Sequence, residues 1–297
     1  MNIPISLVAT LSCALIGGAI KKYFTDTFVD KNLTRHLYNA LTSIVASLVL
    51  LLWGGFGSAS IFTILLAVIF GLVTALQQIT NFKALETGPW SYTSVLISLS
   101  TLIPALSGAL FFNESIGVFQ IIGMVLLVAC FILSVDFSKS DKKANLTWLI
   151  YTLIAFLCTG AIGVMQKVHQ TSEFKNELNA FLIIAFAVSF VYSLLFTIVH
   201  TKKTLLLADQ EKTNAMKIYK VIPFVLMAIA GATVAVCNKL NLYLSGVMNT
   251  AVFFPLVNGG GLVLTTICAV TVFKEKLTLR QWIGLVVGTA SVILLVL

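Results

Sequence analysis

The polar side chains best suited to binding a small solute lie at the ends of two long apolar runs of this sequence. They form two clusters, one of Gln77, Gln78 and Asn81 and one of Asn238, Lys239 and Asn241. On a helix, residues three or four positions apart share a face, so Gln78 lies beside Asn81 and Asn238 beside Asn241. Buried polar groups in a membrane must contact one another, water or a ligand. We expect both clusters to line a substrate site, the alternative being that they hold helices together.

Two further apolar runs add candidate ligand contacts. The run near the C-terminus combines Asn249 and Asn258 with Pro255 and the glycines at 259–261, a pattern typical of an interrupted helix with free backbone groups. The alternative is that the glycines let a neighbouring helix pack closely. In the fourth run, Tyr92 and Ser98 add a ring and hydroxyl groups to the predicted substrate-binding set.

Three lysines lie within or at the ends of apolar runs: Lys22, Lys167 and Lys239. If they face a cavity, Coulomb attraction favours an anionic or zwitterionic ligand. The alternative is that their long side chains carry the ammonium groups to the membrane surface.

Carboxylates, in contrast, are confined to turns, loops and the ends of apolar runs. Glu114 and Glu275 precede predicted helices, and we interpret both as caps that satisfy free backbone amides. A carboxylate inside the membrane, expected for proton-coupled export of organic cations, is absent from the sequence. The sequence also has no known catalytic motif, metal-ligand cluster or cofactor signature, so we expect no enzyme, no metal and no cofactor.

The composition defines the elements that must position these groups. Hydrophobic residues make up 59% of the chain and charged residues only 10%. A soluble domain cannot cover its surface with so few charges, which predicts an all-α integral membrane protein in contact with a lipid bilayer. The five cysteines all fall in apolar runs and are interpreted as small core residues.

Ten apolar runs approach the length of about 20 residues that a membrane-spanning helix needs. They cover residues 3–20, 37–53, 59–76, 92–112, 116–135, 147–165, 180–199, 219–237, 247–273 and 279–297. The first run lacks the basic start and the suitably placed cleavage site of a secretory signal, so we interpret it as a span.

The two halves of the sequence resemble each other. FFNESIGVFQIIG at 111–123 matches VFKEKLTLRQWIG at 272–284, and each segment has one glutamate in a turn and an isoleucine-glycine pair in the next run. CALIGGAIKKY at 13–23 aligns with CTGAIGVMQKV at 158–168, which sets Lys22 opposite Lys167. These matches predict a first repeat at 1–135, a polar linker at 136–146 and a second repeat at 147–297. Duplicated units of this kind are common in secondary transporters.

The segment from Ala84 to Val135 resembles the end of an EamA-like repeat of the drug/metabolite transporter superfamily, and the segment 248–297 is similar. The features are an Ala-Leu pair after the third run, Pro104 in the fourth, the glutamate turn and the following glycine. The second copy has no proline opposite Pro104, and only the first keeps an arginine, Arg35, at the start of its second helix.

The resemblance implies ten transmembrane helices in two inverted five-helix repeats. It also implies a central cavity lined mainly by the first, third, fourth, sixth, eighth and ninth helices. An odd number of spans in each unit requires inversion on topological grounds alone.

The distribution of basic residues predicts the orientation. Loops after odd-numbered runs hold sixteen lysines and arginines, and loops after even-numbered runs hold three. The positive-inside rule then places both termini outside the cytoplasm of a bacterial plasma membrane, opposite to the common orientation of the family that the chain resembles.

The sequence as a whole predicts a carrier that moves a small polar metabolite by alternating access. The solute is anionic, zwitterionic or neutral, such as an amino acid or a nucleobase. The alternatives are an exporter of organic cations and a membrane receptor or scaffold that transports nothing. The net charge of +8 is spread over membrane-flanking loops, which indicates no nucleic-acid partner. One chain suffices to enclose a pathway, and a homodimer is compatible with the sequence.

Overall fold

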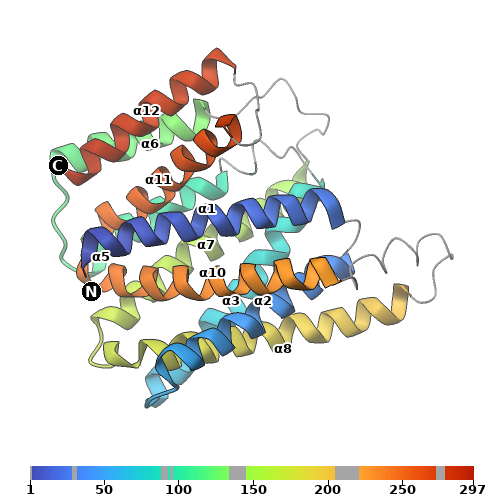
Figure 1. Ribbon diagram of the computed structural model, residues 1–297. Helices are drawn as coiled ribbons and strands as arrows, with labels where there is room; N and C mark the ends of the chain where they lie inside the picture. Colours follow the sequence, from blue (N-terminus) through green and yellow to red (C-terminus); the bar gives the residue numbers. More distant parts are fainter. Residues whose placement is uncertain are drawn as a thin grey trace. The chain divides into compact units, whose positions relative to one another are not determined.

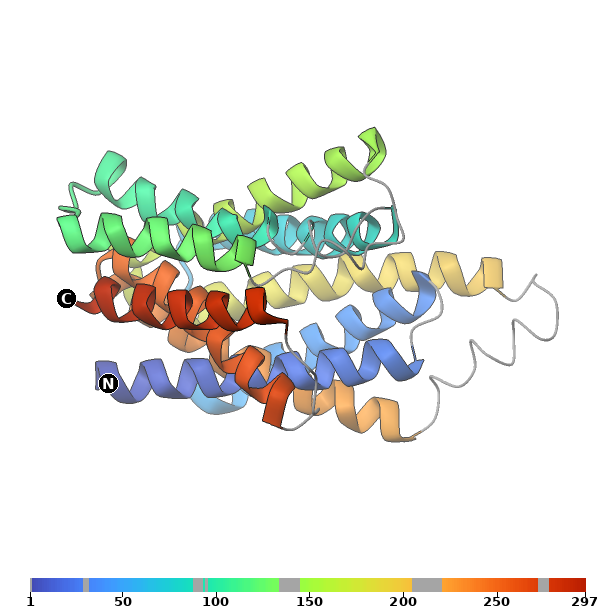
Figure 2. The same cartoon turned by 90° about the horizontal axis from the view of Figure 1, so that it is seen from above.

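The chain forms long helices, shown in a computed structural model that describes residues 2–28, 32–87, 93, 96–133, 145–204, 221–271 and 278–297 (Figures 1 and 2). Within these residues there are ten α-helices: α1 (Ile3–Phe28), α2 (Asn32–Gly54), α3 (Ile61–Thr87), α5 (Leu102–Phe111), α6 (Val118–Leu133), α7 (Leu146–Thr171), α8 (Leu178–Thr204), α10 (Val221–Val247), α11 (Thr250–Thr271) and α12 (Leu279–Val296). Two short 3-10 helices, η1 (Leu99–Thr101) and η3 (Lys175–Glu177), complete the described elements.

Each predicted apolar run overlaps one of these helices. Among the described residues, six segments are long and apolar enough to cross a membrane: His36–Gly54, Ile61–Asn81, Leu146–Thr171, Lys175–Val199, Ile222–Val247 and Leu279–Val296. Four apolar segments are shorter: Ile3–Gly17, Leu96–Phe111, Val118–Leu133 and Thr250–Leu264. The prediction of an all-helical chain with apolar spans is confirmed.

The chain divides into two compact units. Unit 1 comprises Met1–Ala75 and Ser172–Asn241, and unit 2 comprises Leu76–Thr171 and Leu242–Leu297. The helices α3 and α10 therefore each contribute to both units. Each unit combines segments from both halves of the sequence, and the repeat boundaries at 1–135, 136–146 and 147–297 stay a prediction.

In unit 1, α2 and α8 lie side by side (Figures 1 and 2). Small polar side chains join them: Ser43 contacts Ser189 at 3.3 Å, and Ser47 donates to the carbonyl of Ile183 at 3.3 Å. The start of α3 approaches α8 through Gly71, where an added Cβ would lie 2.5 Å from the carbonyl oxygen of Ala185. Small residues thus allow the close backbone approach that is common between membrane helices.

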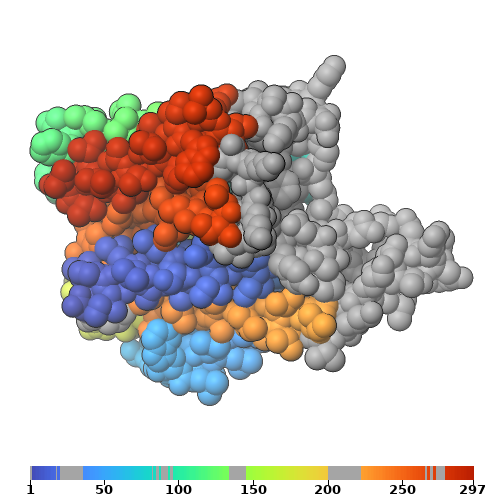
Figure 3. Space-filling model, turned by 45° about the horizontal axis from the view of Figure 1, so that its top comes forward, coloured from blue at the N-terminus to red at the C-terminus, as the bar shows by residue number. Residues whose placement is uncertain are grey.

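In unit 2, α6 packs against α12, and the two helices also adjoin in the space-filling view (Figure 3). Ser291 donates a hydrogen bond of 2.7 Å to the carbonyl of Gly123. An added Cβ at Gly288 would lie 2.5 Å from Sγ of Cys130. The outer faces of both helices carry exposed apolar side chains such as Val125 and Val286, which suit contact with lipid. Other neighbours in unit 2 include α11 with α12 and α5, and α5 with α7.

The fourth and ninth predicted spans differ in their continuity. In the fourth, the 3-10 helix η1 precedes α5, because Pro104 has no N–H to bond the carbonyl four residues earlier. The prediction of an interrupted ninth span is wrong, because α11 is one helix with Pro255 inside it. Pro255 lies in the second turn, and an added Cβ at Gly259 would lie 2.6 Å from a methyl carbon of Leu127. At Gly259 the close-packing interpretation therefore applies.

Candidate functional site

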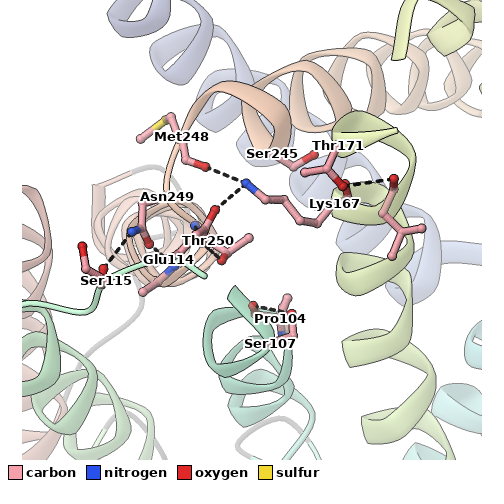
Figure 4. Close-up of polar contacts among 12 residues, drawn as sticks. Pro104, Ser107, Glu114, Ser115, Lys167, Thr171, Ser245, Met248, Asn249 and Thr250 are labelled. Atoms are coloured by element: carbon pink, nitrogen blue, oxygen red, sulfur yellow. Dashed lines mark hydrogen bonds and ion pairs between the residues drawn. The ribbon is translucent and has the colours of Figure 1, made fainter. Parts of the chain in front are cut away.

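A turn after α5 presents Glu114 at one end of unit 2. The N–H groups of Phe112 and Glu114 both donate to the carbonyl of Gly108, at 3.1 and 3.0 Å. Between them, Asn113 adopts a left-handed conformation with φ of 52°, which asparagine tolerates better than most residues. The turn directs the Glu114 carboxylate back across the end of α5 (Figure 4).

The partner of this carboxylate is Lys167, one turn before the end of α7. Its Nζ lies 2.5 Å from Oε1 of Glu114, and the two side chains are only 5% and 14% exposed. Lys167 also donates to the carbonyl of Met248 at 3.3 Å, just beyond the end of α10 (Figure 4). The ammonium group is therefore bound to protein atoms on two sides.

The second carboxylate oxygen of Glu114 binds the start of α11. The N–H of Thr250 donates to Oε2 at 2.7 Å, and the Thr250 hydroxyl donates to the same oxygen. A carboxylate at a helix N-terminus satisfies free amides and interacts favourably with the positive end of the helix dipole. Glu114 is thus a cap, as the sequence predicted, although it caps α11 rather than the helix that follows it in the chain.

Asn249 completes this end of α11. Its Oδ1 accepts from the N–H of Ala251 at 2.8 Å, and its Nδ2 donates to the carbonyl of Ser115 at 3.0 Å. Asn249 therefore ties the start of α11 to the residue next to Glu114. We call Glu114, Lys167, Asn249 and Thr250 the terminal polar cluster.

The pKa of Glu114 reflects these contacts. Burial raises the pKa of the carboxyl group, but hydrogen bonds from Lys167 and Thr250 and the positive charge of Lys167 outweigh burial and hold it below the ordinary value of 4.5. Glu114 is consequently ionised at neutral pH.

The amides of the first predicted patch lie on α3 within unit 2. Gln77, Gln78 and Asn81 are half-buried, and their side chains form no hydrogen bond with another described residue. The second patch belongs to unit 1, so the expectation that the two patches face each other stays a prediction.

The side chains of the second patch have local partners on α10. Asn238 donates to the carbonyl of Val234 at 2.9 Å, and Asn241 contacts Sγ of Cys237 at 3.7 Å. The Oδ1 of Asn241 is buried and has no hydrogen bond among the described residues. Lys239 extends to the end of α2, where its Nζ lies 4.1 Å from the centroid of the Trp53 ring. This cation–π contact favours the interpretation that Lys239 reaches toward the membrane surface.

The other predicted site residues are distributed as follows. Asn258 is exposed on α11 and donates to the hydroxyl of Thr101 at 3.0 Å. Ser98 is half-buried at the start of η1 and forms no capping bond. Tyr92, Glu275 and the side chain of Lys22 lie outside the described residues.

Sequence reasoning missed the pairing of Glu114 with Lys167 and the part that Thr250 plays. One signal was present, since Glu114 and Lys167 follow even-numbered runs and so belong to the same side of the membrane in the predicted topology. The sequence also gave no indication that Glu177 caps α3, where it accepts from the N–H and hydroxyl of Ser60 at 2.9 and 2.8 Å.

Comparison with known proteins adds independent evidence on fold and family. Residues 4–135 match the EamA-like transporter family. The first half of the chain is EamA-like. The resemblance that the sequence predicted is thereby confirmed for residues 4–135, and with the apolar helices this match identifies an integral membrane protein.

The chain is also similar to a solved crystal structure. The alignment covers 98% of this chain and 98% of the other, with a TM-score of 0.72 and 15% sequence identity. At this identity the likeness concerns the fold alone. A search of curated proteins returned no match.

Proposed function

We propose that this protein is a secondary transporter of the drug/metabolite type. In this proposal, two inverted five-helix repeats move a small polar solute by alternating access. The EamA-like match of residues 4–135 supports the transporter class. The packing supports the repeat, because helices at equivalent positions in the two halves pair within each unit: α2 with α8, α5 with α11 and α6 with α12. A two-fold relation between the halves would produce this pairing.

The amides on α3 that have no hydrogen bond with another described residue carry the substrate proposal. Gln77, Gln78 and Asn81 lie on a helix long and apolar enough to span the membrane, where an unsatisfied amide is costly. Water or a solute with hydrogen-bonding groups removes this cost. We therefore assign these three residues to the substrate path, together with Ser98 and Asn258 of unit 2 and Asn238 and Asn241 of unit 1.

The charges refine the solute class. In this structure Glu114 neutralises Lys167, and the ammonium group of Lys239 lies over Trp53, so neither of these two lysines presents a free positive charge to a ligand. We infer that hydrogen bonding, rather than the charges of Lys167 and Lys239, governs recognition. We favour a neutral or zwitterionic solute, such as a nucleobase or an amino acid, over a purely anionic one.

A thermal-stability screen of the purified, detergent-solubilised protein tests the solute class. A ligand that binds only the folded state raises the apparent melting temperature by mass action. We expect saturable shifts with neutral or zwitterionic compounds among amino acids, nucleobases, sugar phosphates, vitamins and quaternary amines. Shifts confined to quaternary amines would favour the exporter of organic cations, and binding without flux into liposomes would favour a receptor.

Two substitutions test the assigned residues. The double variant Gln78→Leu with Asn238→Leu should abolish uptake of the compound found in the screen, because leucine cannot replace the amide hydrogen bonds. The control Thr289→Val removes a polar group from an exposed position on α12 and should transport normally. Normal uptake by a folded double variant would remove Gln78 and Asn238 from the substrate path.

A further inference from the structure

The terminal polar cluster joins segments that are distant in the sequence. Glu114 follows α5 in the first half of the chain, whereas Lys167 and Thr250 belong to α7 and α11 of the second half. The ion pair and the Thr250 bonds are all in unit 2 and meet at the carboxylate of Glu114 (Figure 4). One side chain thus connects the ends of three helices.

A permanent connection between membrane helices does not require charge. Removing two ions from water costs several kcal/mol for each ion, and apolar residues of similar volume often stabilise a protein as well or better. Glu114 and Lys167 are nevertheless buried to 14% and 5% exposure. When the helices separate, water can rehydrate both groups of a charged contact, unlike those of an apolar contact. A charged contact therefore suits an end of unit 2 that opens and closes.

The residues around Glu114 fix the geometry of its contacts, so that the contacts are either formed or broken. An added Cβ at Gly108 would lie within 2.3 Å of a Glu114 carboxylate oxygen and still closer to the Thr250 hydroxyl, so the end of α5 lies directly against the cluster. The left-handed Asn113 and the two bonds to the Gly108 carbonyl fix the direction of Glu114. Any displacement of α5 from α11 therefore moves the carboxylate away from Thr250.

We propose that Glu114, Lys167 and Thr250 form a charged latch that holds α5, α7 and α11 together at this end of unit 2 in one state of the transport cycle. In the opposite state the ion pair is broken and this end admits water. The proposal rests on the proposed function, since alternating access requires an end that opens. A static brace is the competing interpretation.

Asn258 provides a position from which opening can be measured. It lies eight residues after Thr250 on α11, roughly 12 Å deeper along a helix that rises 1.5 Å per residue. Its side chain is exposed, and an exposed amide at this depth suits a watery path better than lipid. The variant Asn258→Cys is therefore labelled with a membrane-impermeant maleimide, applied separately to intact cells and to inverted vesicles.

Each latch variant is measured with and without Asn258→Cys, so that labelling of the native cysteines is subtracted. Glu173→Cys, at an exposed position beyond α7, identifies the membrane face on which the latch lies. Glu177→Gln is the matched control, because it removes a carboxylate that caps α3 and leaves Glu114 and Lys167 intact.

If the cluster is a latch, Glu114→Gln and Lys167→Met should each increase the rate at which Asn258→Cys is labelled from the latch face. We expect an increase of about tenfold or more, which corresponds to a tenfold change in the ratio of open to closed protein. The double variant Glu114→Gln with Lys167→Met has no unpaired buried charge, so its melting temperature should return to the wild-type value. Asn258→Cys in the double variant should nevertheless still be labelled fast. The control Glu177→Gln labels at the wild-type rate.

A static brace predicts a different result. The single variants then melt at a lower temperature than wild type, and the double variant melts at the wild-type temperature. The labelling rate of Asn258→Cys either stays at the wild-type value or rises equally from both faces of the membrane. That outcome overturns the latch, and the double variant decides the question even where a single variant does not fold. The labelling experiment needs no solute, whereas the ligand screen tests the proposed function. A failure of the latch proposal can therefore be distinguished from a failure of the proposed function.

Discussion

Glu114 shows how one carboxylate satisfies two needs of a membrane protein. It neutralises the buried ammonium group of Lys167 and also accepts the free N–H of Thr250 at the start of α11. Each contact alone leaves part of a buried ion unsolvated, and together they occupy both carboxylate oxygens. The bond from Lys167 to the Met248 carbonyl completes the network.

The lowered pKa of Glu114 gives a prediction for pH. A carboxyl group with a folded-state pKa below its unfolded value stabilises the folded state above the unfolded pKa and loses this contribution as pH falls through the folded pKa. Wild type should therefore melt at higher temperature than Glu114→Gln at pH 7, and the difference should narrow below pH 4.5. Parallel melting curves of the two proteins between pH 7 and pH 3.5 measure this. A difference that grows on acidification would contradict the assigned pKa direction.

At the scale of elements, small residues decide which helices can pack closely. The contact of α6 with α12 brings Gly288 to Cys130 and Gly123 to Leu295. Between membrane helices the lipid supplies no hydrophobic driving force, so close van der Waals contact and hydrogen bonds must provide the attraction. The glycine of the repeated isoleucine-glycine pair therefore has a packing role at Gly123.

Overpacking this contact should destabilise the protein. Gly288→Val places its Cβ 2.5 Å from Sγ of Cys130, and we expect a cost of about 1–3 kcal/mol. Ala290→Val adds the same kind of side chain to an exposed position of α12 and should change the melting temperature little. Thermal unfolding in detergent compares the two variants. Equal melting temperatures would show that α6 and α12 tolerate separation.

At the scale of the whole molecule, the distribution of basic residues predicts how the chain inserts into the membrane. Sixteen lysines and arginines follow odd-numbered runs, and three follow even-numbered runs. Positive residues near the ends of spans tend to be retained in the cytoplasm, so we predict that the latch lies on the opposite face of the membrane from the segment 205–220.

Cysteine accessibility tests this orientation. A cysteine at Gln210 should resist an impermeant maleimide on intact cells and react in inverted vesicles. A cysteine at Glu173, in the segment after α7, should show the reverse pattern. Labelling of the Gln210 variant on intact cells would overturn the predicted orientation, while the fold and the latch geometry would be unaffected.

The sequence by itself determined the membrane class, the helical spans and the EamA-like resemblance. These properties are local, because hydrophobicity, turn residues and short repeated motifs are read along the chain. It also identified polar residues that a membrane helix cannot bury without a reason, among them Gln77, Gln78 and Asn81. Only the folded chain showed that their side chains form no hydrogen bond with another described residue.

Only the tertiary structure decided which polar groups satisfy one another. Lys167 was a candidate ligand contact, and the folded chain pairs its charge with Glu114, a residue distant in the sequence. The glycines after Pro255 suggested a broken helix, yet α11 continues through them and Gly259 packs against Leu127. Both outcomes depend on which helices are neighbours in space, and no periodicity along the chain encodes that choice.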